Sequence, residues 1–217
     1  CSSSWHKHYG VIKFNLIYSN TLKAPLLPLW GLFLNNNMAT IVWLNGPSRQ
    51  PLIKTLPQQN IEVGCNYIRN DRKVNHVVCF DQPMMKALTI EPVVTYWTRD
   101  YYAKPGMWNT VKNIEGRFRV EAQNSGILAI QLAHNLTDRK KDNIYIIGCD
   151  WGLSNDTAYD YSSVRGKNKY PLKHSNHCIK HLYYMNKTDN NIFIVHNDKP
   201  DVTIPIITIK DFLQKIQ

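Results

Sequence analysis

Polar residues directly follow several apolar runs of the chain, and their types suit ligand binding. Asn45, Asn66, Asp81 and Asp150 each come just after a run with the character of a buried strand. The carboxyl ends of neighbouring parallel strands share one edge of a sheet, and ligands bind there in open α/β folds. We therefore expect these four side chains to line one polar crevice.

The first of these runs ends abruptly in a turn of small residues. "TIVWL" (40–44) is followed by Asn45-Gly46-Pro47-Ser48, which disfavours a continued strand. Asn-Gly-Pro is favourable turn chemistry in itself. A ligand at the end of the strand would equally call for small residues, and both explanations stay open at this point.

The elements that would position these residues alternate along the chain. Apolar runs rich in β-branched residues predict strands over 40–44, 61–68, 76–80, 93–97, 143–150 and 192–197. Helical spacing predicts helices over 127–136, 175–186 and 208–216. Ser125 is the expected N-cap of the first helix, and Ser175 that of the second, with Ile179, Leu182 and Tyr183 on one face. The pattern predicts a doubly wound, mainly parallel α/β sheet.

The first part of the chain differs from the rest. Two prolines interrupt the apolar run "APLLPLWGLFL", and an ordinary alternating sequence begins only at Met38. We expect residues 1–37 to be an extension outside the fold and residues 38–217 to form one nucleotide-binding α/β domain.

The net charge and the cysteines indicate which class of partner and which compartment to expect. The formal net charge of +10 predicts an anionic partner, and no apolar run is long enough to span a membrane. Cys65, Cys79 and Cys149 lie in apolar runs and form no CxxC pair, which is typical of small buried hydrophobes in a reducing cytoplasm. The oligomeric state stays open, a homo-oligomer included.

Three motifs, taken in order, resemble a known family. "NGPS" after the first strand, "CNY" after the second and "NSGILAIQLA…IYIIGCD" are similar to the bacterial sialyltransferases that modify surface glycans. The same signature occurs in a wider group that includes archaeal pterin diphosphokinases and phage glycosyltransferase-like proteins. The resemblance covers residues 40–197 and implies a Rossmann-like (GT-A-like) single domain.

The resemblance also implies the site. In the sialyltransferases the first turn, the second-strand Asn and the Ser-Gly helix start hold a cytidine nucleotide sugar, without a metal or other cofactor. A helix N-terminus suits phosphate because it offers free N–H groups and a positive dipole end. The positions implied for donor binding are Asn45, Gly46, Ser48, Asn66, Ser125 and Gly126. Asp81, Asn124, Asp150, Trp151 and Gly152 complete the expected substrate-binding set.

The expected catalytic residues follow from the same resemblance. The family's general base is a His before a Ser at the start of a late helix, which "KHSN" places at His174. Two family tyrosines stabilise the departing phosphate. Here Trp151-Gly152 stands where the first would fall, and Tyr159 or Tyr161 lies near the second.

Other interpretations of the same residues remain open. His174, His177, Cys178 and His181 share one helical stripe, so a metal site is an alternative to a mixture of core and surface histidines. The tyrosines around 159–184 could stack on bases of single-stranded nucleic acid or pack over the site.

Three function classes result. The first is a transferase that takes a nucleotide-activated sugar to an unknown acceptor, a glycan or a modified nucleic acid. The second is a diphosphokinase-like or other nucleotide-using enzyme, and the third is an inactive binding module of the same fold.

Overall fold

The computed structural model describes residues 39–98, 109–110, 124–137, 142–151, 153, 176, 178–183, 185, 191–199, 202 and 204–217. The chain divides into two compact units, Cys1–Asn36 and Asn37–Gln217. The first unit lies outside the described residues, so the expected N-terminal extension over 1–37 stays a prediction. Everything below concerns the second unit.

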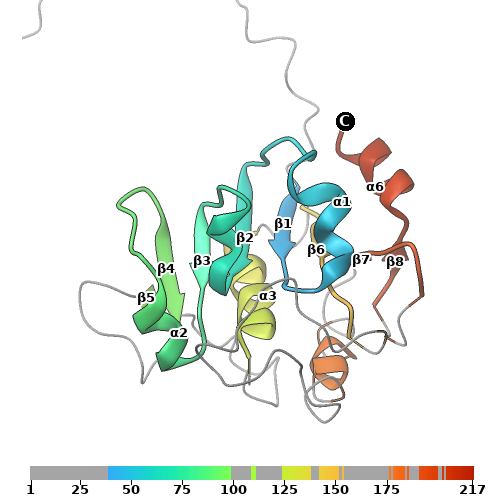
Figure 1. Ribbon diagram of the computed structural model, residues 1–217. Coiled ribbons are helices and arrows are strands. Elements are labelled where there is room, and N and C mark those ends of the chain that lie inside the picture. The colour runs from blue at the N-terminus through green and yellow to red at the C-terminus, as the bar shows by residue number, and fades with distance from the viewer. Residues whose placement is uncertain are drawn as a thin grey trace, which may run out of the picture. The chain divides into compact units, whose positions relative to one another are not determined.

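The described part of this unit contains one eight-stranded sheet in the order β5-β4-β3-β2-β1-β6-β7-β8 (Figure 1). Every neighbouring pair is parallel, which confirms the predicted α/β architecture. The strands are β1 Thr40–Trp43, β2 Ile61–Cys65, β3 His76–Val78, β4 Thr95–Thr98, β5 Asn109–Thr110, β6 Ile144–Ile147, β7 Ile192–Val195 and β8 Ile206–Ile207.

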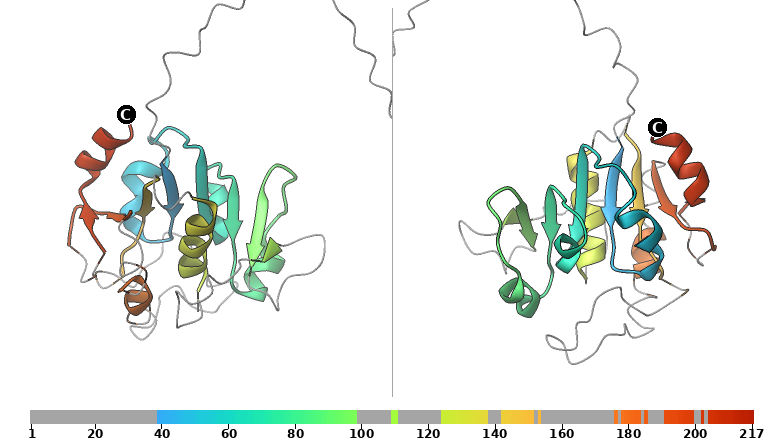
Figure 2. Two further views of the ribbon diagram at one scale, coloured as in Figure 1. Left: turned by 180° about the vertical axis from the view of Figure 1, so that it is seen from behind. Right: turned by 45° about the horizontal axis from the view of Figure 1, so that its top comes forward.

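Helices cover both faces of the sheet. α3 (Ser125–Leu136) lies on one face, and α1 (Gln50–Ile53), α2 (Gln82–Ala87) and α6 (Ile209–Lys215) lie on the other (Figures 1 and 2). The central strands are therefore apolar on both sides, and all four residues of β1 are buried. Val42 packs into the α3 core, whereas Trp43 packs into the core beneath α1.

The connection between β1 and β6 determines where a ligand can enter. From β1 the chain builds β2 to β5 on one side, and then returns through α3 to place β6 on the other side of β1. Strand order thus reverses beside β1. In open parallel sheets, such a topological switch point opens a crevice at the carboxyl ends of the strands, which is the lower edge of the sheet in Figure 1.

Several predicted boundaries are wrong by a few residues. The second strand ends at Cys65, because Asn66 begins the short 3-10 helix η3 (Asn66–Asn70). The helix predicted over 127–136 starts two residues earlier. Its cap is Asn124 and not Ser125, since Asn124 Oδ1 accepts the Ile127 N–H at 2.9 Å while the Ser125 hydroxyl bonds elsewhere.

The helix predicted over 175–186 is observed where it is described, but its buried face differs from the prediction. Residues 178–183 are helical, and Cys178, His181 and Leu182 are buried. Tyr183 was expected beside Leu182 on one face and is instead 39% exposed. Ser175 lies outside the described residues.

The cysteines of the described residues are buried, which the apolar runs predict for Cys65, Cys79 and Cys149. Cys65, Cys79, Cys149 and Cys178 are free thiols inside the fold. Burial raises the pKa of the Cys149 thiol well above its ordinary value and that of Cys178 to about 12. Both thiols therefore stay protonated at neutral pH.

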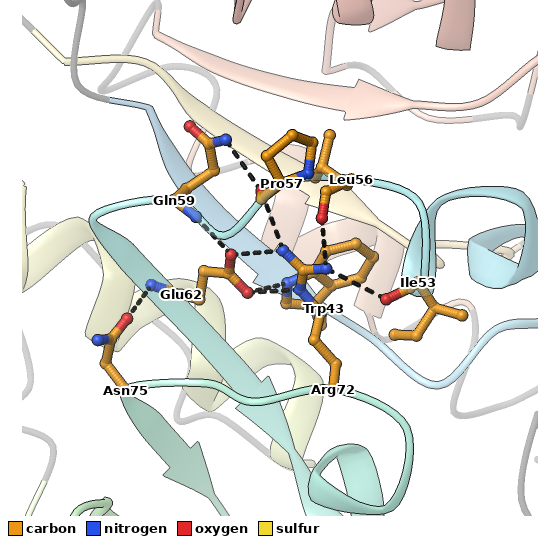
Figure 3. Close-up of polar contacts among 8 residues, drawn as sticks. All are labelled: Trp43, Ile53, Leu56, Pro57, Gln59, Glu62, Arg72 and Asn75. Carbon is orange, nitrogen blue, oxygen red and sulfur yellow. Dashed lines mark hydrogen bonds and ion pairs between the residues drawn. The ribbon is translucent and has the colours of Figure 1, made fainter.

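A buried ion pair ties the end of α1 to the amino end of β2 (Figure 3). Arg72 donates from Nε and Nη2 to the two carboxylate oxygens of Glu62, at 2.6 Å each, and Glu62 is fully buried. The remaining Arg72 donors bind the backbone carbonyls of Ile53, Leu56 and Pro57. The guanidinium lies 4.6 Å from the ring centroid of Trp43, whose Nε1–H also binds Glu62.

Among the described residues, no helix combines the length and the apolar character that crossing a bilayer requires.

Candidate functional site

The Asn45–Ser48 turn is joined to the end of β6 by backbone and side-chain bonds. Gly46 N–H donates to the Gly148 carbonyl at 3.0 Å, directly after the ladder bond from Leu44 N–H to Ile147 O at 2.8 Å. Ser48 N–H donates to Asp150 Oδ2 at 3.0 Å. The structure therefore places Gly46, Ser48 and Asp150 together at the switch point between β1 and β6.

Position 46 requires glycine, because the neighbouring chain leaves no room for a side chain there. A Cβ atom on Gly46 would lie 2.5 Å from Asp150 Cγ and 2.5 Å from the Gly148 carbonyl oxygen. Gly148 has a φ of +78°, which only glycine adopts easily. The two glycines allow the turn and the end of β6 to pass each other closely.

A buried arginine holds Asn45. Arg49 is fully buried, and its Nη1 donates to the Leu44 carbonyl at 3.2 Å and lies 3.5 Å from Asn45 Oδ1. Its Nη2 pairs with Asp71 Oδ2 at 3.1 Å. Asn45 is itself buried to 8% exposure, so its amide is fixed at the carboxyl end of β1.

Asn66 and Ser125 meet at the end of β2. Phe80 N–H donates to Ser125 Oγ, and Ser125 Oγ donates to Asn66 Oδ1, both at 3.0 Å. These bonds link the carboxyl ends of β2 and β3 to the first residue of α3. Asp81 follows Phe80 and lies half-buried at the N-cap position of α2.

The backbone of Asn66 is unusual. Its φ is +54°, a left-handed value that among the described non-glycine residues occurs only here. Asn66 is fully buried, and its Nδ2 has no hydrogen-bond partner among the described groups. A buried, unsatisfied donor and a left-handed backbone each cost free energy of order 1–3 kcal/mol. Residues that retain such costs gather at functional sites.

The start of α3 is closely packed. Asn124 caps the helix through Oδ1, and its Nδ2 donates to Cys178 Sγ. A Cβ atom on Gly126 would lie 3.0 Å from the Trp151 ring and 3.3 Å from Leu44. Trp151 therefore lies beside the N-terminus of α3 and near β1.

His196 belongs to this edge and was not among the predicted residues. It follows β7, and its Nε2 lies 3.3 Å from Asp150 Oδ1, with both side chains under a tenth exposed. The rule that selected Asn45, Asn66, Asp81 and Asp150, a polar residue directly after an apolar strand, applies equally to "IFIVH". Sequence reasoning could have found His196 by applying that rule to the last predicted strand.

Some predicted site residues cannot be placed. Gly152, Tyr159, Tyr161 and His174, together with His177 of the alternative metal stripe, lie outside the described residues. Within the described ranges, no three His, Cys, Asp or Glu side chains gather as a metal site would require.

Comparisons with protein-family models, with curated proteins and with solved structures find no match for this chain.

Proposed function

We propose that the protein binds a nucleotide at the carboxyl edge of its sheet and acts as a glycosyltransferase-like enzyme on a nucleotide-activated sugar. The observation that carries the proposal is the gathering of Asn45, Ser48, Asn66 and Ser125 at and beside the β1/β6 switch point. These residues come from separate parts of the chain and match, in order, the donor-binding motifs of the sialyltransferase-like proteins.

The chemistry of this edge suits a nucleotide phosphate. α3 is 12 residues long, so its N-terminus carries a positive dipole end and N–H groups that can bind an anion. Asn66 adds an amide nitrogen that has no partner among the described groups, next to Ser125, the first residue of that helix. The net charge of +10 draws anions toward the whole molecule.

In the proposed reaction, a hydroxyl of the acceptor attacks the sugar carbon while the nucleotide phosphate departs. The resemblance assigns the removal of the hydroxyl proton to His174 and help for the departing phosphate to Tyr159 or Tyr161. A positioned base contributes about 10² to 10⁴ in rate. The donor would be cytidine-linked, and no metal takes part.

Trp151 favours one second candidate, a binding module that keeps the nucleotide site without the transfer reaction. Trp151 is half-buried against the start of α3 and has no hydroxyl to offer a departing phosphate. Nucleotide binding without turnover would be the signature of this alternative.

Isothermal titration of the full chain with cytidine monophosphate and with ATP, each with and without magnesium, tests the proposal. We expect metal-independent binding of cytidine monophosphate. Magnesium-dependent binding of ATP alone would indicate a diphosphokinase-like enzyme instead, and no binding of either nucleotide would contradict the proposal.

A pair of histidine variants tests the transferase reaction separately. His174→Ala should lower turnover about 10²-fold or more and leave cytidine monophosphate affinity nearly unchanged, because the base touches the acceptor and not the donor. His177→Ala is the matched control and should change neither. Full activity in His174→Ala would remove the assignment.

A further inference from the structure

His196 and Asp150 form a contact between the ends of two neighbouring strands. Asp150 follows β6, His196 follows β7, and their side chains are 6% and 7% exposed. A carboxylate buried to this extent needs donors around both of its oxygens. Oδ2 has one in the backbone N–H of Ser48, at 3.0 Å.

The imidazole lies between the Asp198 backbone and the Asp150 carboxylate. Asp198 N–H donates to His196 Nδ1 at 2.9 Å, and a backbone N–H can only donate. Nδ1 also lies 3.2 Å from the Asp198 carbonyl oxygen, a contact that would need a proton on Nδ1. The bond from Asp198 N–H is the shorter of the two and favours the neutral tautomer with its proton on Nε2. Nε2 lies 3.3 Å from Asp150 Oδ1. This is a close polar contact without the alignment of a hydrogen bond, and Oδ1 has no hydrogen-bond partner among the described groups.

The Asp150 carboxylate in turn shapes the first turn of the site. It binds Ser48 N–H, and it lies so close to Gly46 that an added Cβ would be 2.5 Å from Asp150 Cγ. A shift of the carboxylate would therefore move the turn at the end of β1. Polar contacts therefore run from Asp198 N–H through the His196 ring and the Asp150 carboxylate to Ser48 N–H.

We propose that His196 is a positioning residue for the ligand site. Its Nε2 lies against the Asp150 carboxylate and keeps it in place, and the carboxylate fixes Gly46 and Ser48 in the turn that receives the ligand. His196 acts through Asp150 and does not itself touch the ligand. The consequence for ligand affinity rests on the proposed nucleotide function, whereas the effect on the turn does not.

Three variants separate this role from general stability. His196→Leu removes the ring N–H donor, and His196→Gln keeps an N–H donor on a side chain of similar reach. Asp198→Ala is the matched control. It removes a carboxylate that is 79% exposed and 3.9 Å from Nδ1 and leaves the backbone N–H that orients the ring.

Two-dimensional ¹⁵N NMR of the full chain provides the first measurement. We expect the wild-type ring to be the Nε2–H tautomer. The amide signals of Gly46 and Ser48 should shift in His196→Leu and stay near their wild-type positions in His196→Gln and Asp198→Ala. Unchanged Gly46 and Ser48 signals in folded His196→Leu would overturn the proposal. Should that variant not fold, an Nδ1–H tautomer in the wild type would overturn it.

Titration with cytidine monophosphate provides the second measurement. The affinity should fall about tenfold in His196→Leu, as expected for losing a buried polar contact with a charged group, and recover in His196→Gln. Equal affinity in wild type and His196→Leu would refute the link between His196 and the ligand. A wild type that binds no nucleotide, but whose Ser48 signal still responds to His196→Leu, would refute the proposed function and support the positioning role.

Discussion

Asn66 combines three properties that stability alone does not explain. It is fully buried, its backbone is left-handed, and its amide nitrogen has no described partner. Its one described side-chain bond, from Ser125 Oγ, fixes Oδ1 and leaves the two Nδ2 hydrogens at the start of α3. These properties suit a residue that serves a ligand.

Asn66→Gly separates binding from folding. Glycine adopts a φ of +54° without steric cost, and this gain offsets the loss of the Ser125 bond. We expect the free energy of unfolding to stay within about 1 kcal/mol of the wild type, while cytidine monophosphate affinity falls severalfold. Thermal unfolding and calorimetric titration measure the two quantities. Asn70→Ala, at the exposed end of η3, is the control, and unchanged affinity in Asn66→Gly would contradict a ligand role.

His76 makes stability depend on pH. Burial lowers its pKa below the ordinary 6.5, and Trp97 Nε1–H donates to its Nδ1 at 3.1 Å, which requires that nitrogen to be unprotonated. The unfolded chain therefore binds a proton more readily than the folded chain. The stability that neutral His76 contributes is complete above pH 6.5 and is lost as the pH falls from 6.5 through the lowered pKa.

The variant His76→Gln tests this dependence, because glutamine can accept the Trp97 bond but does not titrate. We expect the wild type to lose stability between about pH 7 and pH 5 more steeply than His76→Gln. Denaturant unfolding at several pH values measures the difference in slope, and parallel profiles would contradict the role of His76.

At the scale of elements, the central strands could be predicted and the short edge elements could not. β1, β6 and β7 are apolar runs buried on both faces, which is a strong sequence signal. β5 and β8 are two residues each, and α1 has four. None of them is long enough to show a periodic pattern of apolar residues. The sequence does not distinguish Asn124 from Ser125 as the cap of α3, because both residue types are equally favourable at that position. Only the positions of Phe80 and Asn66 show that the Ser125 hydroxyl is engaged elsewhere.

The Glu62–Arg72 pair links α1 to β2, and sequence reasoning missed it. The backbone carbonyls that Arg72 also binds cannot be recognised from any motif. We expect Glu62→Gln to destabilise the fold by about 3–5 kcal/mol, since it leaves a buried guanidinium without its counter-charge. Glu91→Gln removes the partner of Arg69 in an ion pair whose Glu91 side chain is 41% exposed, and it should cost about 1 kcal/mol or less. Equal losses in chemical denaturation would show that burial of the pair is unimportant.

At the scale of the whole molecule, the sheet order explains how a site assembles from distant motifs. Ser48 and Asp150 are 102 positions apart in the sequence, yet they meet because β1 and β6 are neighbours. The strand-end rule could predict this edge without knowing the strand order. It could not predict which residues touch, because the contacts depend on the register and on the reversal of strand order beside β1.

Truncation tests the predicted division of the chain. A protein starting at Met38 retains every strand and helix described here, so we expect its melting temperature and unfolding cooperativity to equal those of the full chain. Calorimetry of both proteins makes the comparison. Loss of cooperative unfolding in the shorter protein would show that residues 1–37 belong to the fold.

The central claim is that the carboxyl edge beside β1 and β6 is a nucleotide site, and mapping the bound nucleotide tests it most directly. In a ¹⁵N-labelled full chain titrated with cytidine monophosphate, we predict saturable shifts at the amides of Asn45, Gly46, Ser48, Asn66, Ser125 and Gly126. The amides of Glu62, near the amino end of β2, and of its ion-pair partner Arg72 should stay unchanged. Shifts centred on Glu62 and Arg72, or no saturable shifts at all, would contradict the account.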